Sequence, residues 1–124
     1  MPTPIRVVVG SVTLDAELSD TPCARAVAEA LPIEASISTW GDEFYFSVPV
    51  RQSADDTATL EVKVGDIGYW PPGEALAIFF GPTPASTGDD PVPASEVNVV
   101  GRVLGDARSL KNIARERLIR IERS

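Results

Sequence analysis

Glu43 and Tyr45 are the residues of this chain that are best placed for acid–base chemistry. They alternate along a predicted strand, on the face opposite Phe44 and Phe46. If that polar face lines a cavity, the carboxyl and phenol groups could orient a ligand or act as acid and base. If it faces solvent, both are surface or structural residues, and this is the interpretation that we favour.

Other catalytic groups are scarce. The chain has no histidine and one cysteine, which excludes Ser-His and Cys-His pairs and the common zinc sites. We expect no metal site and no cofactor. Cys23 follows Pro22 in a predicted helix, whose N-terminus could lower the thiol pKa, but we favour a plain, partly buried helix residue. Gly65 and Gly68 precede a strand without a lysine, so they do not indicate a phosphate-binding loop.

All eight aromatic residues lie in two clusters between positions 40 and 80, which indicates a specialised wall or pocket. Neighbouring strand residues point to opposite faces, so we expect one of Tyr69 and Trp70, and one of Phe79 and Phe80, to line a groove. The two prolines after Trp70 would hold its indole in a fixed position. The predicted ligand-binding residues are Trp40, Glu43, Tyr45, Tyr69, Trp70, Phe79 and Phe80.

Short strands must position these side chains, because apolar residues recur at every second position between Gly-containing turns. Residues 52–59 read as a polar loop, and Gly81–Ala94, which contains four prolines, as an extended surface loop. Two strands are predicted around the pairs Tyr69-Trp70 and Phe79-Phe80. The other predicted strands are 5–9, 12–18, 33–37, 44–48, 60–64, 97–104 and 118–121.

Two helices interrupt the strands. The first is predicted from Pro22 to about Leu31, capped by Thr21 or Asp20 and stopped by Pro32. Its expected inward face comprises Ala26, Val27, Ala30 and Leu31. The second, short helix would be capped by Asp106, with Leu110 and Ile113 inward. Together these elements predict a mainly β fold, a closed antiparallel β-barrel of about eight strands with two short α-helices, as one domain over residues 1–124.

Charge and hydropathy restrict the classes of partner that we expect this protein to bind. The formal net charge is −7, and residues 1–101 hold four basic and 15 acidic side chains, a composition that repels phosphate backbones. We therefore expect no nucleic acid partner. No apolar run approaches the roughly 20 residues of a membrane-spanning helix, and no signal peptide is indicated. We expect a cytoplasmic bacterial or archaeal protein that binds no membrane, and a homodimer is possible.

Several strings resemble the cyclophilins, the barrel-shaped peptidyl-prolyl isomerases. Residues 18–31 resemble their second strand and first helix, and Val99-Val100-Gly101-Arg102-Val103 their late strand. The closest resemblance is to small prokaryotic cyclophilin-like proteins of unassigned function, through WGDEFYF at 40–46 and GDIGYWPPGEALAIFFGPTP at 65–84. This resemblance implies the barrel fold and places part of the cyclophilin isomerase pocket at residues 65–80.

The same resemblance argues against isomerase activity. Cyclophilins polarise the prolyl amide with an arginine in a Phe-His-Arg string, helped by a glutamine before Gly-Gly-Asp-Phe, and this chain has neither string. No arginine precedes Arg51 in the corresponding segment, and the pocket histidine of the family falls near Val97. Our hypothesis is a module that binds a small molecule or an extended peptide in an aromatic groove. The alternative is an isomerase with other donors, or another enzyme that uses Glu43.

Overall fold

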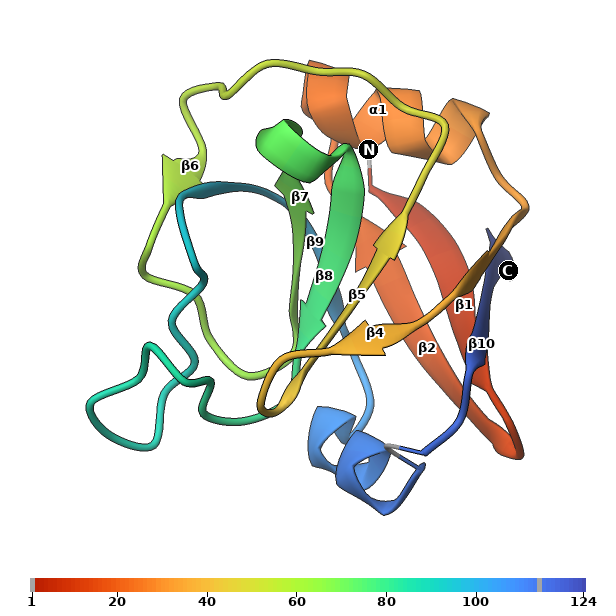
Figure 1. The fold of residues 1–124 in the computed structure, drawn as a ribbon. Helices are drawn as coiled ribbons and strands as arrows, with labels where there is room; N and C mark the ends of the chain where they lie inside the picture. The colour runs from red at the N-terminus through yellow and green to blue at the C-terminus, as the bar shows by residue number, and fades with distance from the viewer. Residues whose placement is uncertain (1, 114) are drawn as a thin grey trace.

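The computed structural model describes residues 2–113 and 115–124, and within them one antiparallel sheet curls into a nearly closed barrel (Figure 1). The elements in chain order are β1 Thr3–Val9, β2 Val12–Leu18, α1 Pro22–Glu29, β3 Ile33–Ser36, β4 Ser38–Thr39, β5 Glu43–Ser47, β6 Ala58–Thr59, β7 Asp66–Trp70, η1 Pro71–Gly73, β8 Ala75–Phe79, β9 Val97–Val103, η2 Ala107–Ile113 and β10 Leu118–Arg123.

The barrel closes through a single bent segment. The strand order is β3-β10-β1-β2-β9-β7-β8-β5-β4, so the strands at the two ends of the order are neighbours in sequence. Ile37 separates them, and its N–H donates to the Arg117 carbonyl at 2.7 Å. If β3 and β4 are counted as one bent strand, eight strands surround the interior, and β6 pairs with β9 outside this path. The predicted antiparallel β-barrel of about eight strands is confirmed.

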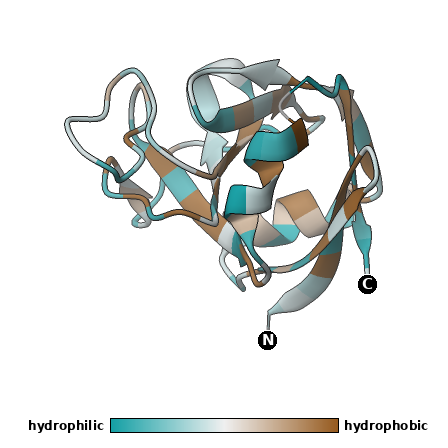
Figure 2. Cartoon of the chain, turned by 90° about the horizontal axis from the view of Figure 1, so that it is seen from below, coloured by the Kyte–Doolittle hydropathy of each residue, from teal (hydrophilic) through white to brown (hydrophobic). Residues whose placement is uncertain are grey.

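The barrel interior is filled by the inward residues of the alternating strands. Figure 2 shows apolar and polar residues alternating along the strands. The Phe44 and Phe80 rings lie 4.8 Å apart between centroids. The largest fully buried side chains, all in this interior except Phe79, which lies in a separate apolar cluster, are Tyr69, Phe44, Phe46, Phe79, Phe80, Ile5, Leu18, Ile67, Leu76, Ile78, Leu110 and Ile119.

Helix α1 begins as predicted and ends earlier. The Thr21 hydroxyl accepts a hydrogen bond from the Ala24 N–H at 3.1 Å, with Pro22 in the first turn. The helix stops at Glu29 and not at Leu31, because a residue before proline is disfavoured in the helical conformation. Its buried face is also shifted from the predicted one: it comprises Cys23, Ala24, Val27 and Ala28. Burial raises the pKa of the Cys23 thiol, so the hypothesis of an activated thiol is wrong.

The predicted strand at 60–64 is absent from the described structure, in which β6 covers only Ala58–Thr59. Local side chains satisfy the backbone there. Thr59 accepts from the Glu61 N–H at 2.9 Å, and Asp66 accepts from the Lys63 N–H at 2.8 Å. The segment still buries Val62, in a second apolar cluster outside the barrel that also contains Ala77, Phe79 and Val97.

The proline-containing stretch 81–94 is a loop, as predicted, and it has internal hydrogen bonds. The Thr83 hydroxyl donates to the Val92 carbonyl, and the Ser86 hydroxyl donates to the Asp90 carbonyl at 2.7 Å. The second predicted helix is the 3₁₀-helix η2 and not an α-helix. Asp106 accepts from the Arg108 N–H at 3.1 Å, and Leu110 is buried. No helix within the described residues is long and apolar enough to cross a membrane.

Candidate functional site

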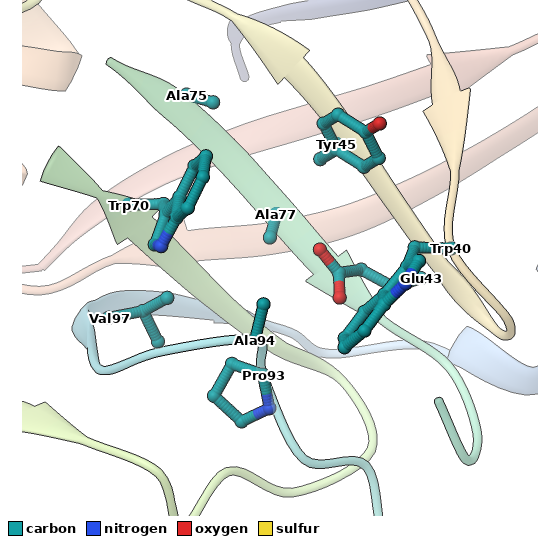
Figure 3. Close-up of a pocket in the computed structure, with 9 residues that line it drawn as sticks. All are labelled: Trp40, Glu43, Tyr45, Trp70, Ala75, Ala77, Pro93, Ala94 and Val97. Carbon is teal, nitrogen blue, oxygen red and sulfur yellow. The ribbon is translucent and has the colours of Figure 1, made fainter. Parts of the chain in front are cut away.

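A pocket of about 200 Å³ lies on the outer face of the barrel, over β5, β7 and β8 and beside the end of the 81–94 loop. Figure 3 shows its lining residues, which are Trp40, Glu43, Tyr45, Trp70, Ala75, Ala77, Pro93, Ala94 and Val97. Segments from both aromatic clusters of the sequence therefore meet at one site.

The register of the strands explains why a pocket forms at this place. Tyr45 of β5 is the partner of Ala77 in β8, and Trp70 of β7 is the partner of Ala75. Each pair places a large ring beside a methyl group, and residues two apart on a strand share a face. The two alanines therefore form a low floor between the taller side chains of β5 and β7.

Trp70 forms a fixed wall. Its indole Nε1 donates to the Ser95 hydroxyl at 2.6 Å, which ties the strand to the segment that covers the pocket. Gly73 follows in η1, and a Cβ at this position would lie 2.6 Å from the Trp70 ring. Only glycine therefore lets the diproline turn fold back against the indole.

Glu43 is the unusual residue of the pocket. The residue is 7% exposed, and Oε1 is buried with no hydrogen-bond partner in the described part of the chain. Desolvation raises the pKa of Glu43 to about 7. The interpretation that Glu43 lies at the surface is wrong, whereas Tyr45 is 38% exposed at the rim. Near neutral pH the Glu43 carboxyl can therefore donate or accept a proton inside an apolar site.

Three of the predicted ligand-binding residues do not line this pocket. Tyr69 is in the barrel core, where its hydroxyl donates to the Val50 carbonyl at 2.6 Å and accepts from the Gln52 N–H at 3.2 Å. Phe80 is also in that core. Phe79 points to the outer face, as strand alternation requires. There it is buried in an apolar cluster that also contains Val62 and Val97.

The pocket also includes residues that sequence reasoning did not select. Ala75 and Ala77 could have been found from the alternation of β8, since their register places them beside Tyr45 and Trp70. Pro93 and Ala94 carry no local signal, because their position depends on how a long loop folds back. Val97, to which the resemblance assigns the place of the cyclophilin histidine, does line the pocket.

Cationic groups are missing from the described lining. Arg51 is 90% exposed and pairs with Glu74 at 2.7 Å, away from the pocket. Within residues 2–113 and 115–124 no cluster of three or more acidic or cysteine side chains is placed to hold a metal ion. The pocket therefore offers one carboxyl group, three aromatic residues and a small apolar floor.

Comparisons with known proteins agree with this architecture. The family model described as cyclophilin-like matches residues 3–122. The solution structure of a hypothetical protein from Archaeoglobus fulgidus is similar, with 37% sequence identity, a TM-score of 0.81, and coverage of 99% of this chain and 95% of that chain. The comparison with curated proteins gave no match. With a family match over almost its whole length and a barrel that superimposes on that of a relative, the chain belongs to the cyclophilin-like family.

Proposed function

We propose that this protein is a non-catalytic binding module whose outer-face pocket takes a ring-sized group. The observation that carries the proposal is a buried carboxyl oxygen of Glu43 without a partner among the described residues, in a pocket walled by Trp40 and Trp70. Buried polar atoms normally have a hydrogen-bond partner, so an orphan in a cavity suggests that a ligand supplies it.

The size of the pocket limits the ligand. A cavity of about 150 Å³ lined by apolar side chains accepts benzene. The pocket here holds about 200 Å³, enough for one ring with a short polar substituent. Such a group could be a free small molecule or one side chain of an extended peptide.

Replacing Trp70 by alanine is expected to weaken binding of a ring-sized probe by about tenfold or more, because it removes one aromatic wall. Benzyl alcohol can serve as the probe, with the fluorescence of the remaining Trp40 as the signal. Calorimetry would provide a readout independent of the missing indole.

The control is Leu118→Ala, which truncates a side chain that is 59% exposed on β10 and does not line the pocket. Its affinity should equal that of the wild type. A folded Trp70→Ala protein that binds the probe as tightly as the wild type would remove the support for this site.

A second candidate function is catalysis by Glu43, favoured by its pKa of about 7, a value suited to a general acid or base near neutral pH. For prolyl isomerisation specifically, no arginine of the described chain lines the pocket to polarise the amide. Exchange NMR on an Ala-Pro peptide, with and without catalytic amounts of protein, is expected to show no acceleration. Faster cis/trans exchange that is lost in Glu43→Gln would replace the binding proposal with an enzymatic one.

We further propose that the protein acts in a prokaryotic cytoplasm, without nucleic acid or membrane partners, as a monomer or homodimer. The net charge of −7 supports the exclusion of nucleic acid.

A further inference from the structure

We propose that the ligand of this pocket is a small organic ammonium ion with a ring-sized apolar body, whose N–H groups bind the Glu43 carboxylate. The inference rests on the proposed binding function and specifies the chemical class of the ligand. It follows from the charge, the aromatic walls and the floor of the pocket.

The charge of the pocket comes from one group. Glu43 is the charged residue among those that line it, and the adjacent Asp42 is already paired with Lys111 of η2, with 3.2 Å between Oδ2 and Nζ. The Glu43 Oε1 has no such partner within the described residues. An ammonium group would supply charge-assisted hydrogen bonds to the carboxylate, and an anion would place a like charge beside it.

Aromatic rings complete the cation site. Figure 3 shows the Glu43 carboxyl beside Trp40, with Trp70 across Ala77 from it. The Trp70 indole N–H already donates to Ser95, so Trp70 offers a ligand its ring and not a donor. Ring faces of tryptophan and tyrosine attract organic cations, and the attraction grows when water is excluded.

The floor selects an apolar body. Ala75, Ala77 and Val97 contribute methyl groups to the lining, and Pro93 adds a ring from the covering segment. A hydrated inorganic cation would leave these apolar surfaces exposed to water, whereas the ring of an organic ligand would bury them against its own carbon atoms. A benzylammonium-like shape therefore matches both the apolar and the charged parts of the pocket.

The test compares three probes of nearly equal size, benzylamine, benzyl alcohol and benzoate, by calorimetry at pH 8 on wild type and Glu43→Gln. We expect the wild type to bind benzylamine about tenfold or more tighter than benzyl alcohol, and benzoate most weakly. In Glu43→Gln the amine should lose this advantage and bind no more tightly than benzyl alcohol.

A second measurement needs no variant. The Glu43 carboxyl of the wild type is followed by carbon NMR as pH is varied, with saturating benzylamine or with benzyl alcohol. Benzylamine should lower the apparent pKa of Glu43, and benzyl alcohol should not, because only a bound cation favours the carboxylate. This readout remains informative even if Glu43→Gln fails to fold.

The outcomes separate the two proposals. Equal affinities for amine and alcohol in the wild type, or an amine preference that survives in Glu43→Gln, would overturn the cation inference and leave the binding pocket in place. If none of the three probes binds, the proposed binding function itself fails, and the cation inference fails with it.

Discussion

Replacing Gly101 by alanine is expected to destabilise the protein by more than about 3 kcal/mol, since no small side-chain movement can relieve the overlap. A Cβ at this position would lie 2.2 Å from the Glu17 carbonyl oxygen and 3.1 Å from the Leu18 Cα. Both are backbone atoms of β2. The packing of β9 against β2 therefore leaves room only for the hydrogen atom of glycine at position 101.

The position matters because Gly101 lies at a junction of the sheet. It is the register partner of Leu18 in β2 and of Ile67 in β7, and β9 joins the N-terminal hairpin to the strands of the pocket. If β2 moves away to admit a methyl group, that junction opens. Urea unfolding monitored by tryptophan fluorescence measures the loss.

Gly88→Ala is the matched control, since a Cβ there would meet nothing within 4 Å. Its unfolding free energy should stay within about 0.5 kcal/mol of wild type. A Gly101→Ala protein as stable as the Gly88→Ala protein would show that β2 and β9 are less closely packed than the structure indicates.

Glu43→Gln is expected to change how stability depends on pH. Burial raises the pKa of Glu43 in the folded protein from an ordinary 4.5 to about 7. Between these values the unfolded chain releases a proton that the folded chain keeps, so the free energy of unfolding of wild type falls as pH rises. The loss is complete above the folded pKa and amounts to about 3 kcal/mol.

Glutamine carries no such proton, so the free energy of unfolding of Glu43→Gln relative to wild type should rise by about 3 kcal/mol from pH 4 to pH 8. The difference between the two curves isolates Glu43 from other groups near the site, which include Tyr45 and the Asp42–Lys111 pair. Denaturant unfolding at several pH values provides the comparison.

Ser47→Ala serves as the control, because Ser47 is exposed on the same face of β5 and carries no titratable group. Its stability should follow the pH dependence of wild type. Parallel curves for wild type and Glu43→Gln would mean that the Glu43 carboxyl is hydrated in solution, and the pocket would then lose its distinctive group.

Local sequence was sufficient for much of the fold. The period of two predicted the first hairpin, whose register runs from Thr3–Leu18 to Val9–Val12. Thr21 and Pro22 marked the start of α1 because capping depends on a few adjacent residues. Where adjacent side chains satisfied the backbone, as around Thr59 and Asp66, the same periodicity predicted a strand at 60–64 that does not form.

By itself, the sequence determined a mainly β barrel and which residues share a strand face, since alternation and turn chemistry are properties of neighbouring residues. Tertiary structure decided what covers each face. Glu43 and Phe79 are register partners on the outer face, and one is beside a cavity while the other is packed under Val62 and Val97. Burial there depends on segments distant in the chain that fold over the sheet, so only the folded protein turns a polar strand position into a buried carboxyl in a pocket, with one oxygen that no described residue pairs.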